Sequence, residues 1–81
     1  MDEYLLKQHL ARAQLRRTLP DPADRRLLRK RLGLSQQQLA DVLGVQRVTV
    51  ARWELGARNP SDEHLEPYLT VLGVRGEEVP T

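Results

Sequence analysis

Cysteine is absent from this chain of 81 residues, and histidine occurs only twice, at His9 and His64. Without cysteine the protein has no disulfide framework and no thiolate metal site. The two histidines are far apart in the sequence, so they form no metal-binding motif. No apolar run is long enough for a membrane span or a signal peptide, and we therefore expect a cytoplasmic protein with no membrane partner.

Patterns that carry enzyme chemistry are also missing. The sequence holds no paired carboxylate site, no arrangement of a nucleophile with histidine, no phosphate-binding loop and no cluster of metal ligands. We therefore expect no enzyme, no catalytic residue, no metal and no cofactor. The length predicts one domain with a small but sufficient core.

Charge is present but unevenly placed. Residues 12–58 hold eleven basic and four acidic side chains, a net charge of +7, whereas residues 59–81 hold one basic and five acidic side chains, a net charge of −4. A basic centre predicts a polyanionic partner. From charge alone, a solvated basic face without a partner is an equal alternative.

Helical patterns run through the first half of the chain. Residues 3–18 are mostly good helix formers, and apolar residues recur among them at helical spacing. Leu19-Pro20-Asp21-Pro22 then ends this helix, because proline clashes with a continuing helical turn and restricts the residue before it. A second helix is predicted from about Pro22 to Leu32, with Asp21 as its N-cap and Gly33 just beyond its end.

The second half of the chain has its own helix signals. Ser35 and Gln38 form the capping-box pattern at the start of a third helix, and Gly44 ends it. A fourth helix is predicted from about Arg47 to Leu55. Ser61 is the predicted N-cap of a last segment, in which Pro67 either kinks the helix or starts another short one.

The stretch GVQRVTVARWEL, residues 44–55, needs a decision between strand and helix. Its alternating valines favour a strand, but nothing else in the chain offers a strand to pair with it. As a helix, Val50 and Trp53 share one side at a spacing of three residues. We therefore interpret it as a helix with Val50 and Trp53 buried and Arg47, Val48 and Arg52 on the outer face.

The run LGLSQQQLADVLGVQRVTVARWELGARNP, residues 32–60, carries a combination of features. Gln36 begins a helix, Ala40 is small where two helices cross, Gly44 makes a turn, and Val50 and Trp53 bury the next helix. This combination resembles the phage-repressor-like helix-turn-helix family of Cro/cI type, also called the xenobiotic-response-element group. The similarity extends more loosely over residues 25–74.

The resemblance implies a compact all-α bundle like that of lambda repressor, whose second helix-turn-helix element enters the major groove of DNA. It implies two groups of DNA-contacting residues. Those facing base edges are Gln46, Arg47, Val48 and Arg52. Those contacting the backbone are Gln36, Gln37, Thr49, Arg58 and Asn59.

The resemblance also implies an internal ion pair between Arg29 and Glu54, because an acidic residue on a DNA-facing helix needs neutralising within the protein. Two features depart from the family. Arg25 stands where relatives often have an apolar residue, so the second helix is expected to pack differently. An N-terminal helix is added, whereas relatives usually continue into another helix after the position of Leu72-Gly73-Val74.

The added helix divides the chain into an N-terminal helix at 1–19, a helix-turn-helix domain at 20–74 and a flexible acidic tail at 75–81. The helix either packs on the core or buries its apolar side chains against a second copy, and we favour a homodimer. The residues assigned to this dimer or partner interface are Leu5, Leu6, Leu10 and Leu15.

The sequence therefore predicts a bacterial or phage-encoded transcriptional regulator, acting as a repressor that binds a two-fold site on double-stranded DNA as a dimer. Two further kinds of partner stay open. An antitoxin would bind a protein toxin through the N-terminal helix or the acidic tail and repress its own operon. Contact with RNA polymerase through Asp41 or Glu66 would allow activation.

Overall fold

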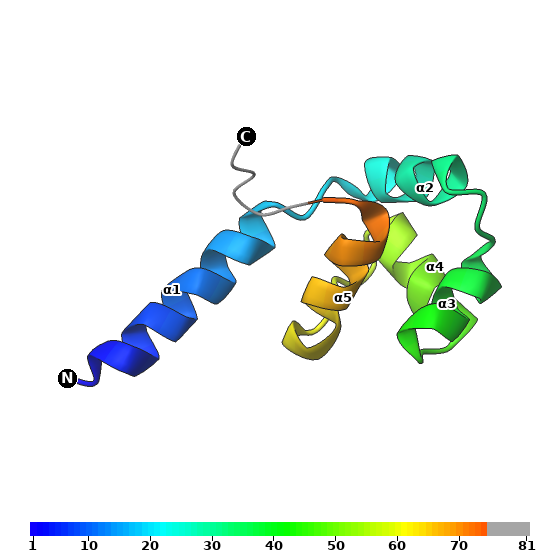
Figure 1. The fold of residues 1–81 in the computed structure, drawn as a ribbon. Helices are drawn as coiled ribbons and strands as arrows, with labels where there is room; N and C mark the ends of the chain where they lie inside the picture. The colour runs from blue at the N-terminus through cyan, green and yellow to red at the C-terminus, as the bar shows by residue number, and fades with distance from the viewer. Residues whose placement is uncertain (75–81) are drawn as a thin grey trace.

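The computed structural model describes residues 1–74, and this part of the chain forms helices only. The helices are α1 (Glu3–Arg17), α2 (Pro22–Arg31), α3 (Gln36–Leu43), α4 (Arg47–Leu55) and α5 (Asp62–Leu72). Helices α2 to α5 pack into a bundle, and α1 runs away from it along a separate axis (Figure 1). The all-α prediction is confirmed for these residues. The acidic tail predicted at 75–81 lies outside the described part.

The residues at the helix ends explain most of the helix boundaries. The capping box at α3 is confirmed, because the Ser35 hydroxyl accepts from the Gln38 amide and the Gln38 side chain accepts from the Ser35 amide. Asp21 is the N-cap of α2 as predicted, but its side chain makes no capping hydrogen bond. Pro22 explains the difference in part, since its fixed φ favours the first helical turn without help from a side chain.

The core lies where α3, α4 and α5 meet. Leu39, Ala40 and Val50 are fully buried, and Trp53 stacks at a tilt on Tyr68 with 4.7 Å between ring centroids. The predicted burial of Val50 and Trp53 is confirmed. Ala40 has no exposed surface where α3 packs on α4, so a larger side chain there would force the helices apart.

Helix α5 resolves the alternative left open at Pro67. The proline lies inside one helix that runs from Asp62 to Leu72, so no second helix begins there. Pro67 removes one backbone hydrogen bond, but Leu65, Tyr68 and Leu69 around it are buried. Tertiary packing of this apolar face therefore holds the helix together across the proline.

Helix α1 is held to the bundle at its C-terminal end. Arg16 donates to the backbone oxygen of Pro60 at 2.9 Å and to Asp62 at 2.6 Å, and Arg12 pairs with Asp62 at 3.3 Å. Leu15 is half-buried beside α5. No residue of α1 is buried, so the contact with α5 is an anchor at one end rather than a shared core.

Candidate nucleic-acid interface

The turn between α3 and α4 sets the angle of the two helices. Gly44 adopts φ 71° and ψ 31°, and the amide of Val45 donates to the Ala40 oxygen at 3.0 Å. A Cβ built at Gly44 would meet no neighbouring atom within 4 Å. Glycine is therefore required by the left-handed backbone and not by lack of space.

The outer face of α4 carries the residues assigned to base contacts. Gln46, Arg47, Val48 and Arg52 are exposed, and Val48 keeps 40% of its surface accessible. The opposite side of the same helix holds Val50 and Trp53 in the core. Arg52 forms no ion pair within residues 1–74. The helix thus presents a basic and partly apolar face to solvent.

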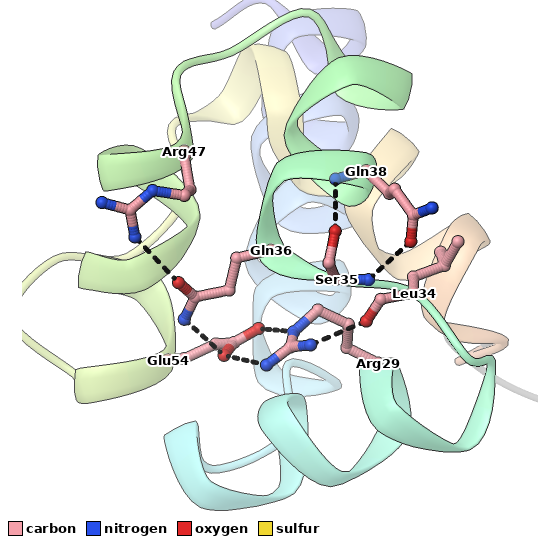
Figure 2. A network of polar contacts seen from close by, with 7 residues as sticks. All are labelled: Arg29, Leu34, Ser35, Gln36, Gln38, Arg47 and Glu54. Atoms are coloured by element: carbon pink, nitrogen blue, oxygen red, sulfur yellow. Dashed lines mark hydrogen bonds and ion pairs between the residues drawn. The ribbon is translucent and has the colours of Figure 1, made fainter.

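Glu54 is turned away from this face. Its carboxylate accepts from Arg29 Nε at 2.6 Å and from Arg29 Nη2 at 3.0 Å, a bidentate pair that is almost fully buried (Figure 2). Arg29 Nη1 also donates to the Leu34 oxygen at 2.7 Å. The hydrogen bond that Arg29 donates to Glu54 raises the pKa of the Arg29 guanidinium. The negative charge of Glu54 is therefore neutralised inside the protein.

Gln36 joins this buried pair to the outer face. Its Nε2 donates to Glu54 Oε1 at 3.1 Å, and its Oε1 accepts from Arg47 Nη1 at 3.2 Å (Figure 2). The sequence assigned Gln36 to the DNA backbone and Arg47 to bases, without a contact between them. In this structure a chain of hydrogen bonds runs from Arg29 through Glu54 and Gln36 to Arg47.

Arg25, which was expected to depart from the family pattern, is buried beside the core. Its guanidinium donates to the Pro20 oxygen at 2.7 Å and to the Trp53 oxygen at 2.8 Å, and only 5% of the residue is exposed. Burial lowers the pKa of Arg25. The Trp53 carbonyl lies in the last turn of α4 and also accepts a longer hydrogen bond from the Gly56 amide at 3.4 Å, so Arg25 adds a second partner at the end of that helix. The sequence had indicated different packing here but not this contact.

The residues assigned to the DNA backbone fall into two places. Gln36 and Gln37 begin α3, and Gln37 Nε2 donates to Asp41 Oδ1 at 2.8 Å. The others are Thr49 in the first turn of α4 and Arg58 and Asn59 after its end, and they line a hollow of about 290 Å³. The side chains that line this hollow are Thr49, Arg52, Trp53, Arg58, Asn59, Ser61 and His64.

Ser61 and His64 were not assigned to DNA by the sequence. The Ser61 hydroxyl and His64 Nδ1 lie 3.2 Å apart, and the His64 ring stands 6.1 Å from the Trp53 ring. Both follow Asn59 within five residues, and the packing of α5 on Trp53 brings them beside Thr49 and Arg52 of α4. The sequence does contain one signal for these two residues. Ser61 is recognisable as the start of a helix, so the first turn of α5, with His64, directly follows the loop of Arg58 and Asn59.

Two further findings concern the described residues. Within 1–74, no group of histidine, aspartate and glutamate side chains is arranged to hold a metal ion. None of the helices there has the length and apolar character needed to cross a membrane.

Comparison with known proteins gives one match. A helix-turn-helix family model matches residues 26–79, two thirds of the chain, and α1 lies outside the match. No curated protein and no solved structure matches. The family consists of DNA-binding regulators, and the α3–turn–α4 unit lies within the matched range. The chain therefore belongs to the helix-turn-helix family of Cro/cI type and is a DNA-binding transcription regulator.

Proposed function

We propose that this protein is a repressor that binds a two-fold DNA operator as a homodimer, with α4 in the major groove. The observation that carries the proposal is the outer face of α4, where Arg47, Val48 and Arg52 are exposed while Glu54 is buried on another side. An arginine on such a face can donate two hydrogen bonds to O6 and N7 of guanine, which contributes about 1–3 kcal/mol of discrimination. Val48 offers an apolar contact for a thymine methyl.

Backbone contacts would come from both ends of the unit. The hollow that holds Arg58 and Asn59 is also lined by Arg52, which lies on the exposed face of α4. Gln37 and the N-terminal amides of α3 offer donors at the other end. Phosphate contacts of this kind position a protein on DNA without reading sequence. They support α4 in a fixed register against the bases.

A dimer would present two copies of this small DNA-contacting surface. A single reader of this size makes few base contacts, whereas two copies on a two-fold operator read half-sites about one helical turn apart. The apolar side chains of α1 supply an interface outside the helix-turn-helix. Repression then needs only occupancy of a promoter, and DNA binding alone is enough for it.

Selection of bound sequences from a random DNA pool, combined with salt titration, tests the proposal. We expect a two-fold motif and an affinity for it well above the non-specific electrostatic level. Arg52→Ala should relax the base preference at one position of each half-site. Because the dimer loses one contact in each half-site, binding to the selected motif should weaken roughly thirtyfold or more. Arg31→Ala is the matched control, because Arg31 is exposed at the end of α2, away from this face.

The result can contradict each part separately. An affinity for every sequence that stays at the non-specific level would contradict sequence-specific recognition. Equal loss of binding to every sequence in Arg52→Ala would assign Arg52 to phosphate instead of a base. A motif without two-fold symmetry would leave base reading intact and remove the dimer.

One observation favours the antitoxin alternative. A hollow of about 750 Å³ lies between α2 and α4, and the apolar side chains of Leu27 and Leu55 beside it are 55% and 80% exposed. An apolar surface of this kind is typical of protein contacts. A toxin-like gene next to this one, whose product forms a complex of fixed stoichiometry with the chain, would support this function. A complex unaffected by Leu27→Ser and Leu55→Ser would contradict a role for this surface.

A further inference from the structure

Helix α1 has one side that contacts the rest of its own chain. Arg12 and Arg16 are four residues apart on this side, and both reach Asp62 at the start of α5. Leu15 lies beside them next to Leu65. These contacts occupy the C-terminal half of the helix, and the N-terminal half extends beyond the bundle (Figure 1). The chain itself therefore supports only part of α1.

A second side of α1 is apolar and remains exposed to solvent. At 3.6 residues per turn, Leu6, Leu10 and Ala13 lie roughly 100° around the helix from Arg12 and Arg16. Leu6 and Leu10 remain 43% and 50% exposed. A helix of 15 residues with no buried side chain is marginal when isolated in water. The exposed leucines therefore indicate a partner that packs on this side.

The spacing along this side is that of a coiled-coil seam. Glu3, Leu6, Leu10, Ala13 and Arg17 follow one another at intervals of three, four, three and four residues. Apolar residues at such intervals place a continuous stripe against a neighbouring helix. Here the stripe has an acidic residue at one end and a basic residue at the other. A seam of this kind can meet a second copy of itself.

The charges at the two ends distinguish the ways in which copies can meet. Asp2 is occupied as the N-cap, because it accepts from the amides of Tyr4 and Leu5, and Glu3 follows in the first turn. Arg17 ends the helix, and neither Glu3 nor Arg17 forms an ion pair within residues 1–74. In a parallel pair, like charges would face each other at both ends. In an antiparallel pair, opposite charges face each other at both ends.

We propose that α1 pairs with α1 of a second copy in antiparallel orientation, with the leucines at the centre and Glu3 of each copy near the Arg17 end of the other. The inference rests on the proposed dimer and adds its geometry. An antiparallel pair has a two-fold axis across the middle of the helices, so both copies use the same surface. The two α5 anchors then lie at opposite ends of the pair.

Cross-linking of the full chain tests the orientation directly, since the absence of native cysteine leaves only introduced thiols to react. Glu3→Cys and Ala13→Cys variants are mixed and treated with a short bismaleimide. We expect the mixture to give a cross-linked dimer joining the two variants, and Glu3→Cys alone to give none. Cross-linking of Glu3→Cys with itself would overturn the antiparallel orientation while leaving the dimer in place.

Charge reversal tests the same geometry by equilibrium measurement. Sedimentation should show that Glu3→Arg and Arg17→Glu each raise the dimer dissociation constant roughly two- to thirtyfold, because each change affects two symmetry-related pairs. The combined variant should return toward the wild-type value. Its reversed charges disfavour the helix dipole at both ends, so recovery must come from pairing. Single variants without effect would contradict the inference.

Leu10→Glu is the control that removes the apolar centre, and it should sediment as a monomer in which α2 to α5 stay folded. A wild-type chain that stays monomeric at all concentrations would overturn both the antiparallel pair and the dimer part of the proposed function. DNA binding by α4 is tested separately through the salt titration and the Arg52 variant. Failure of the α1 pair is therefore distinguishable from failure of sequence recognition.

Discussion

The bundle and α1 differ in whether their charged residues are buried and paired. In the bundle, Arg25, Arg29 and Glu54 are buried, and each finds partners within the chain. In α1 no residue is buried, and Glu3 and Arg17 are left at its two ends. The bundle therefore supplies partners for its own buried charged groups. In the proposed dimer, Glu3 and Arg17 gain partners from the second copy.

The bundle and α1 obtain their stability from different sources. Buried polar groups must be paired, and removing one partner costs the desolvation of the other. A helix with an uncovered apolar stripe gains most from an external contact. Substitutions inside the bundle should thus change the free energy of unfolding, whereas substitutions on α1 should change association.

Glu54→Ala should give the largest effect. The change leaves the Arg29 guanidinium buried without its carboxylate partner, which costs about 3–5 kcal/mol of unfolding free energy. Urea denaturation measures it, with Glu63→Ala on the exposed part of α5 as the control. Combining Glu54→Leu with Arg29→Met should recover much of the loss. Unchanged stability with an altered base preference would instead make Glu54 a recognition residue.

Tyr68→Phe should have a smaller effect of opposite sign. The Tyr68 hydroxyl is buried and has no hydrogen-bond partner among the described residues, so its removal should stabilise the bundle by about 1 kcal/mol. Burial raises the pKa of Tyr68 to about 12. The folded state therefore holds this proton more tightly than the unfolded state, whose tyrosine pKa is about 10.

This linkage gives the direction of the pH dependence. The contribution of the Tyr68 proton is fully present below about pH 10 and is lost as the pH rises toward 12. Urea denaturation between pH 9 and about 12 should show a loss of stability in the wild type that is reduced in Tyr68→Phe. Tyr4→Phe, a change on exposed α1, is the control. The same alkaline decline in Tyr68→Phe would exclude this tyrosine as its source.

Asp62→Asn should have the smallest effect on the bundle. Arg16, and then Arg12, holds the pKa of the Asp62 carboxyl below its ordinary value. The folded state thus favours the ionised form, so this contribution is present above the ordinary carboxyl pKa and disappears as the pH falls through the lowered value. We expect faster hydrogen exchange in α1 with little change in bundle stability. Protection of α1 equal to that of a Glu63→Gln control would rule out Asp62 as the anchor.

Local signals in the sequence were enough to predict most helix boundaries. Ser35, Gln38 and Gly44 fix the ends of α3 through contacts within a few residues, and such contacts are visible in a pattern. The all-α fold and the burial of Val50 and Trp53 follow from the same short-range periodicity. For α5, the pattern left the effect of Pro67 open, because packing against other helices decides it.

Contacts between distant elements could not be predicted in the same way. The Arg25 bond to the Trp53 oxygen spans 28 positions, and the contact of Arg16 with Pro60 spans 44. The Gln36 bridge between Glu54 and Arg47 likewise depends on how α3 crosses α4. Residue types suggest roles for such side chains, but only the assembled bundle determines their partners.

The buried and the exposed residues of α4 have different roles, and this affects how the protein can diversify. Val50, Trp53 and Glu54 hold the helix in place, while the side chains of Val48 and Arg52 make no hydrogen bond or ion pair with the rest of the described chain. Exchanging those two outward residues therefore alters the surface offered to a target at little cost to folding. Duplicated copies of such a gene can acquire separate targets through very few substitutions, each passing through a folded intermediate.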